Sequence, residues 1–165
     1  MALAREAIRA TLAEEHRVIP ADLTARFPMP AGVFVTLREA DGTLRGCIGT
    51  PSPTQENLVK ELVRVAPLSA TDDPRFPNVR LDELPRLTLE ISILGPLQPT
   101  DESGLDPAVW GVVLTDGEGR RGLLLPGIPQ IETVSQQIAE TRAKAGISPN
   151  AEVSLQRFSV TKLSE

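Results

Sequence analysis

Two hairpin signals constrain the fold of this chain more than any other feature. Asp41-Gly42 and the stretch Asp116-Gly117-Glu118-Gly119 each lie between apolar runs of strand length. The flanking runs are residues 32–38 and 43–50 for the first hairpin, and residues 108–114 and 122–125 for the second. Hairpins join antiparallel neighbours, so we expect a mostly antiparallel sheet rather than a parallel, doubly wound one.

Helical and extended patterns fill the segments around these hairpins. Helices are predicted for residues 2–15 and 132–145, with Gly146 as the stop of the second. Another helix is predicted to begin at Ser52-Pro53-Thr54-Gln55 and to end at Pro67. Residues 86–94 alternate as a strand, and residues 153–163 form a closing strand with a bulge between Leu155 and Phe158. Helices scattered between hairpins predict an α+β fold, with the sheet flanked by helices.

Length, charge and cysteine content limit the classes of protein to which this chain can belong. A chain of 165 residues with 41% hydrophobic residues suits a single domain with room for a small lobe. The net charge of −5 gives no strong signal for nucleic-acid binding, and no apolar run is long enough for a membrane helix. A single cysteine and no signal-peptide pattern predict a cytoplasmic protein. His16 is the only histidine, and a cation at the end of the first helix or a surface histidine is favoured over a catalytic role.

The stretch Leu44-Arg45-Gly46-Cys47-Ile48-Gly49 is the best candidate for chemistry. Strand alternation predicts that Arg45 and Cys47 share one face of the strand, where a nearby cation favours the reactive thiolate. Gly46 and Gly49 leave side-chain space empty, which predicts a close approach to the backbone, a bulge in the strand, or a helix packed tightly over the glycines. A free cysteine is also among the most buried residue types, so a plain core role stays open.

Three charged residues outside that stretch are further candidates. Glu90 lies at the centre of the 86–94 strand and could act as a base if its strand neighbours the cysteine strand. In the loop Asp72-Asp73-Pro74-Arg75, adjacent carboxylates normally diverge, so we expect one aspartate to cap or turn and Arg75 to form an ion pair. The sequence lacks a Walker loop, a GxGxxG fingerprint and a metal-ligand cluster, so no cofactor and no metal are predicted.

Several segments in order resemble the AMMECR domain family, also called system protein A of the AmmeMemoRadiSam group. The resemblance extends over nearly the whole chain, residues 1–165, and LRGCIG is its most specific motif. The matching segments are GVFVTL (32–37), LRGCIG (44–49), DPRFP (73–77), LEISIL (89–94), LLLP (123–126) and KAG (144–146).

The resemblance implies an antiparallel α+β domain with a smaller lobe, and partners that include a Memo-like protein and a radical S-adenosylmethionine enzyme. It marks Arg45, Gly46, Cys47 and Gly49 as hallmark positions, with Asp73, Arg75 and Glu90 as further matches. The chain departs from the family at Trp110, where a histidine is frequent, and at Gly127, where a glutamine is frequent.

Two functional hypotheses follow. The first is a cysteine-dependent enzyme in which Cys47 is the nucleophile, Arg45 stabilises an anion and Glu90 acts as a base. The second is a binding or adaptor module without turnover, in which Arg45 holds a carboxylate or phosphate and Gly46, Gly49, Asp73 and Arg75 shape the surface. The sequence leaves the choice between them open, as well as the substrate and the oligomeric state.

Overall fold

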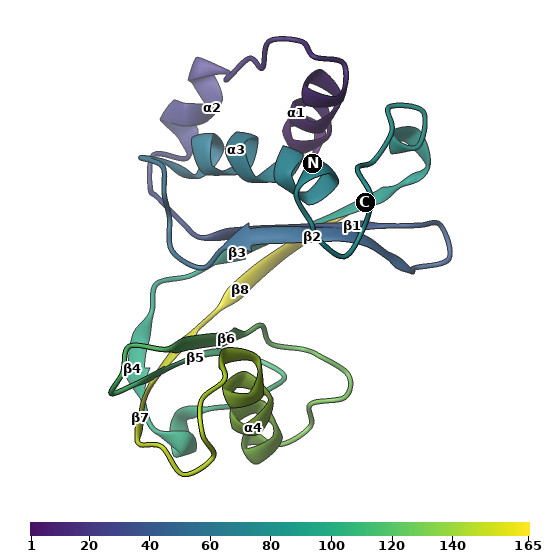
Figure 1. Cartoon of the computed structure of the whole chain (residues 1–165). Helices are drawn as coiled ribbons and strands as arrows, with labels where there is room; N and C mark the ends of the chain where they lie inside the picture. The colour runs from purple at the N-terminus through teal and green to yellow at the C-terminus, as the bar shows by residue number, and fades with distance from the viewer. The chain divides into compact units, whose positions relative to one another are not determined.

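The computed structural model describes all residues 1–165, and the chain divides into two compact units. Unit 1 comprises Met1–Ile93 and Thr161–Glu165, and unit 2 comprises Leu94–Val160. Each unit is built on a four-stranded sheet flanked by helix, and the strand pairs are antiparallel, which confirms the predicted α+β class (Figure 1). No helix combines the length and the apolar character that crossing a lipid bilayer requires.

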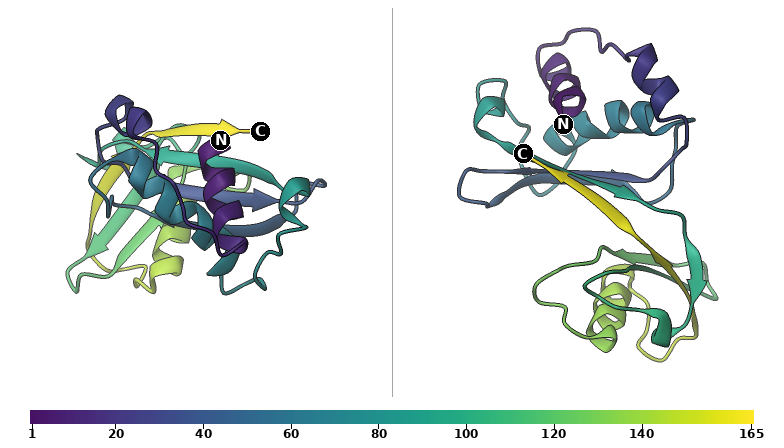
Figure 2. Two further views of the ribbon diagram at one scale, coloured as in Figure 1. Left: turned by 90° about the horizontal axis from the view of Figure 1, so that it is seen from above. Right: turned by 180° about the vertical axis from the view of Figure 1, so that it is seen from behind.

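Unit 1 places helices α1 and α3 on one face of a sheet with the strand order β2-β1-β3-β8 (Figures 1 and 2). The predicted first hairpin is β1 and β2, and β3 pairs with the other side of β1. The elements are α1 (Ala2–Leu12), α2 (Ala21–Arg26), β1 (Val33–Arg38), β2 (Leu44–Thr50), α3 (Leu58–Thr71), η1 (Leu84–Arg86), β3 (Thr88–Leu94) and β8 (Val160–Ser164).

The core of unit 1 follows the period-two pattern of its strands. Val33, Val35 and Leu37 alternate along β1, are fully buried, and form one cluster with the apolar stripes of α1 and α3. The intervening side chains of β1, Phe34 and Thr36, therefore lie on the sheet face that points away from α3.

Helix α3 differs from its prediction at both ends. It begins after Asn57, whose side chain accepts a hydrogen bond from Lys60 N, and not at Ser52. The backbone N–H groups of Thr54 and Gln55, which the Ser52 side chain would have capped, instead donate to the buried carboxylate of Glu61 at 2.6 and 2.8 Å.

Pro67 lies inside α3 rather than at its end. A proline in a helix leaves the carbonyl four residues earlier without its backbone donor, and here that carbonyl belongs to Val63. The guanidinium of Arg17 donates to it from outside the helix, with Nη1 3.4 Å from the oxygen. Helix α3 continues past the proline to Thr71.

Unit 2 contains the second predicted hairpin, β5 and β6, in a sheet with the order β4-β7-β5-β6. Helix α4 begins with a capping box between Thr133 and Gln136 and ends at Gly146, whose φ of 63° confirms the predicted stop. The elements are β4 (Gln98–Thr100), η2 (Glu102–Gly104), β5 (Gly111–Asp116), β6 (Arg121–Leu124), α4 (Val134–Ala145) and β7 (Val153–Phe158).

The predicted closing strand is two strands in two different sheets. β7 pairs with β5 in an uninterrupted register from Gly111↔Phe158 to Asp116↔Val153, so the predicted bulge before Phe158 is wrong. The chain instead leaves this sheet after Phe158 and continues as β8. Leu155 and Phe158 therefore project to opposite faces of a regular strand.

Candidate functional site

The sheet face of unit 1 that points away from α3 carries a row of three functional side chains. Cys47 on β2 is opposite Thr36 on β1, and Thr36 is opposite Glu90 on β3. Residues directly opposite each other in an antiparallel pair project to the same side of the sheet. The row therefore consists of a thiol, a hydroxyl and a carboxylate, one from each of three adjacent strands.

The thiol of Cys47 is half-buried and contacts the hydroxyl of Thr36. Thr36 Oγ1 donates to Cys47 Sγ across 3.3 Å. The backbone N–H of Cys47 points to the other side, toward Asp73, so Cys47 and Thr36 form a non-hydrogen-bonded pair, the type in which opposite side chains lie closest. The pairing register thus sets the contact between sulfur and hydroxyl.

Glu90 lies on the same face as Cys47 but not on a neighbouring strand. Its proposed role as a base required that its strand pair with the cysteine strand, whereas β1 lies between β2 and β3. Two strand spacings put the backbones of Cys47 and Glu90 roughly 10 Å apart. Thr36 is the side chain that lies between the two groups.

Asp73 and Arg75 hold the free edge of β2 at Cys47. Asp73 Oδ2 accepts from Cys47 N at 2.8 Å, and Arg75 Nη2 donates to Cys47 O at 3.3 Å. The two side chains also pair with each other, with 2.7 Å between Asp73 Oδ2 and Arg75 Nη2, which confirms the expected ion pair. Together they satisfy the backbone groups that a further strand would have bound.

The electrostatics of this pair fix its charges. The hydrogen bond from Arg75 is the largest influence on Asp73 and, together with the backbone donors Cys47 and Arg75, outweighs burial and holds the pKa of this carboxyl far below its usual range. Hydrogen bonding to Asp73 in turn raises the pKa of Arg75. The Asp73 side chain is only 2% exposed, whereas that of Arg75 is 55% exposed. The carboxylate is therefore a structural anchor, and the guanidinium faces solvent beside Cys47.

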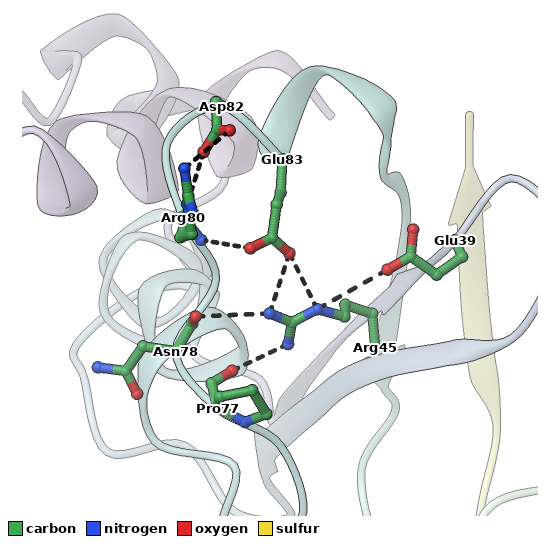
Figure 3. Close-up of polar contacts among 7 residues, drawn as sticks. All are labelled: Glu39, Arg45, Pro77, Asn78, Arg80, Asp82 and Glu83. Atoms are coloured by element: carbon green, nitrogen blue, oxygen red, sulfur yellow. Dashed lines mark hydrogen bonds and ion pairs between the residues drawn. The ribbon is translucent and has the colours of Figure 1, made fainter.

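Arg45 binds elsewhere than sequence alternation predicted (Figure 3). The register of β1 and β2 shifts so that Arg38 pairs with Leu44 and Leu37 with Gly46, leaving Arg45 in a bulge without a partner. Bulges redirect side chains, and the guanidinium of Arg45 extends to the loop before β3.

The contacts of the Arg45 guanidinium hold that loop in place. Its Nη2 lies 3.0 Å from Glu83 Oε2, and its Nη1 donates to Pro77 O at 3.0 Å. Weaker contacts reach Asn78 O at 3.4 Å and Glu39 Oε1 at 3.8 Å (Figure 3). The Arg45 side chain is only 12% exposed, so these partners occupy the cation that the sequence assigned to anion stabilisation at Cys47.

The two glycines of the motif make room for packing. A Cβ on Gly46 would lie 2.1 Å from the carbonyl oxygen of Ser69 in α3, and one on Gly49 would lie 2.2 Å from the ring of Phe34. Helix backbone and an aromatic ring therefore fill the space above them. Close packing is one of the expected alternatives and holds at both glycines, and the bulge, another of them, lies beside Gly46 at Arg45.

Sequence reasoning did not identify Thr36 and Glu83 as partners in this region. Thr36 is one of two polar side chains on β1, and its hairpin register opposite Cys47 was the signal that could have found it. Glu83 carries no such signal, because its contact with Arg45 spans 38 residues and depends on the path of the loop.

The departure at Trp110 lies in unit 2. The guanidinium carbon of Arg157 lies 4.3 Å from the centre of the Trp110 ring, a cation–π contact. Gln137 Nε2 also donates to Trp110 O at 2.8 Å. Tryptophan is thus integrated into the packing of unit 2 at the position where the resembled family often has histidine.

Comparisons with known proteins agree with the resemblance and with the fold. A protein of Thermotoga maritima is 44% identical over 151 residues, covering 90% of this chain and 84% of that protein. A protein of Clostridium acetobutylicum is 35% identical over 99% of this chain, which spans only 35% of the Clostridium protein. The crystal structure of an uncharacterized protein from Pyrococcus horikoshii superposes with a TM-score of 0.89 at 32% identity, covering 99% of this chain and 88% of that one. A family model described as AMMECR1 matches residues 1–163, and this chain therefore belongs to the AMMECR1 family.

Proposed function

We propose that this protein acts through the thiol of Cys47, with its sulfur as the reacting atom of a cysteine-dependent enzyme. The observation that carries this proposal is the half-buried sulfur held against the hydroxyl of Thr36 at 3.3 Å. The hydroxyl contact fixes the direction from which a substrate could reach the sulfur. Because Asp73 and Arg75 hold the backbone of Cys47, the sulfur has a defined position on the sheet.

The row of side chains supports a division of roles. The sulfur would supply the electron pair for a bond to an electrophilic substrate atom, the S–H proton would pass to solvent water, and the substrate bond that breaks would release its leaving group. Glu90 lies on the same face, two strand spacings away and beyond the Thr36 hydroxyl, so it does not take that proton directly. Arg75 replaces Arg45 as the cation beside Cys47, because the Arg45 side chain is committed to Glu83.

A second candidate is a binding module without turnover, in which the exposed Arg75 takes the place of Arg45, because the Arg45 side chain is committed to Glu83. In that case the same face would dock a partner, and the Memo-like protein and radical S-adenosylmethionine enzyme implied by the family are the partners we propose. Replacing Cys47 by serine separates the two candidates. The enzyme would lose its activity, whereas a docking surface would keep its affinity in a pull-down from the source organism.

Alkylation kinetics test the central claim directly, since the protein has one cysteine. We expect iodoacetamide to label the native protein at pH 7 within about tenfold of the rate for the unfolded chain. Thr36→Val removes the hydroxyl at nearly constant volume and should slow labelling severalfold, whereas Thr36→Ser should retain it. Cys47→Ser has no thiol and measures the background labelling of other residues. Native labelling more than about a hundredfold slower than unfolded labelling, or no difference between the valine and serine variants, would count against a reactive thiol.

A further inference from the structure

A hollow lined by basic side chains lies on unit 1, and none of its lining residues belongs to the Cys47 strand. It has a volume of about 280 Å³ and is formed by the chain after α1 together with α3 and the residues before it. Its lining residues are His16, Arg17, Ile19, Gln55, Lys60, Val63 and Arg64. We propose that this hollow binds the phosphoryl group of a small molecule.

The charge of the lining is the first argument. The chain as a whole carries a net charge of −5, yet two arginines, one lysine and the only histidine line this one hollow, and no carboxylate does. An anion approaching most of this molecule meets net repulsion. Here it meets several cationic donors within one concave surface, which is how proteins concentrate anionic ligands.

The position of Arg17 is the second argument. Pro67 cannot donate to the carbonyl of Val63, and Arg17 Nη1 occupies that vacancy at 3.4 Å. A single donor of the guanidinium is used in this way, and the group has five N–H donors in total. Pro67 inside α3 thus leaves a carbonyl that holds the Arg17 guanidinium at the hollow. Most of the N–H donors of this guanidinium stay free for a ligand.

Two carboxylates beside the hollow offset part of its positive charge, and neither pairs with Arg17. Glu61 lies 3.8 Å from Arg64, and its oxygens also accept hydrogen bonds from Thr50 Oγ1, Thr54 N and Gln55 N. Burial alone would raise the pKa of Glu61, and these hydrogen bonds outweigh it and lower the pKa, so the Glu61 carboxylate is ionised beside Arg64. Glu56 pairs with Lys60 at the exposed surface, where such pairs are weak.

The arrangement fits a phosphoryl group better than a carboxylate. A phosphate ester offers three peripheral oxygens and close to two negative charges, which several separate cations can share. Guanidinium groups are suited to this task because their planar donors bind two oxygens at once. The apolar side chains of Ile19 and Val63 offer contact for the organic part of the ligand.

The test measures binding of inorganic pyrophosphate, inorganic phosphate and acetate to the full chain by calorimetry at low salt. We expect pyrophosphate to bind more tightly than phosphate, and acetate not to bind measurably. Arg17→Gln with Arg64→Gln should weaken pyrophosphate binding by at least about tenfold, since each lost charge-assisted contact costs about that much. A matched control, Arg86→Gln with Arg121→Gln, removes the same charge from exposed positions elsewhere and should leave affinity within about twofold.

Amide shift mapping by NMR keeps the proposal testable if the double variant folds poorly. Pyrophosphate should shift the amides of residues 16–19 and 55–64 in the unmodified protein. Equal weakening in both double variants, acetate binding as strong as that of phosphate, or shifts confined to other residues would each overturn the proposal. None of these results depends on the reactivity of Cys47, so the two proposals stand or fall separately.

Discussion

Asp73 accepts a hydrogen bond from the backbone N–H of Cys47 at 2.8 Å, although 26 residues separate the two. β2 is an edge strand, so this N–H would otherwise face outward without a strand partner. The carboxylate that fills this position is buried and is itself bound by Arg75. The geometry of the candidate site therefore depends on a side chain that takes no part in the proposed chemistry.

The first prediction concerns removal of that charge. Asp73→Asn keeps the shape of the side chain, but it leaves the donors of Cys47 N and Arg75 competing for one carbonyl oxygen. Loss of a buried, charge-assisted network costs about 2–4 kcal/mol of unfolding free energy, measured by urea denaturation. Asp82→Asn, in the exposed pair with Arg80, is the control and should cost less than about 0.5 kcal/mol. Equal losses in the two variants would contradict the anchoring role.

The second prediction concerns acid. The pKa of Asp73 is lower in the folded protein than the usual value near ~3.9 in an unfolded chain. Between those two values the unfolded state binds more protons, so the stability contributed by Asp73 is complete above about pH 4 and is lost as the pH falls through the folded value. The difference in unfolding free energy between the unmodified protein and Asp73→Asn should therefore shrink below about pH 4. A difference that stays constant down to pH 2 would assign the effect to something other than this ionisation.

Much of the fold was predictable because local signals carry it. Asp41-Gly42 gave the first hairpin, and alternation along β1 and β3 identified their buried faces. Gly146 ends α4 with positive φ, as a glycine after a helix does. Helix α2 was not predicted, since none of its residues is buried and it therefore leaves no periodic apolar stripe.

The predictions that proved wrong concern features that depend on contacts between distant residues. Residues 52–55 resemble a helix start, but Glu61 captures their backbone donors, and Pro67 is tolerated because Arg17 reaches Val63 O. At the site, the Asp73–Arg75 ion pair could be predicted from spacing, whereas its place at the strand edge requires the sheet order. Gly46 indicated a bulge as one alternative, and the register shift lies beside it, but the contact between Arg45 and Glu83 that follows from it depends on the path of a distant loop.

The third prediction tests the packing role of the motif's glycine. In Gly46→Ala the new Cβ would lie 2.1 Å from the carbonyl oxygen of Ser69, an atom of helix backbone that cannot rotate away. We expect a loss of more than about 3 kcal/mol, or failure to fold, because strand and helix would have to separate. Gly117→Ala is the control, as nothing lies within 4 Å of its Cβ position. Thermal unfolding of both variants measures the loss of stability. A well-folded Gly46→Ala protein of normal stability would refute close packing at this glycine.

The fourth prediction concerns the replacement donor in α3. Arg17→Ala should destabilise the protein by about 1 kcal/mol, the usual net value of one hydrogen bond, because Val63 O is left without a donor. Pro67→Ala restores a backbone N–H at the position that donates to that carbonyl, so in this background Arg17→Ala should cost almost nothing. A double-mutant cycle on unfolding free energies isolates this coupling from the packing that Pro67→Ala also changes. If Arg17→Ala costs the same in both backgrounds, the arginine does not compensate for the proline, and the helix must continue past Pro67 for another reason.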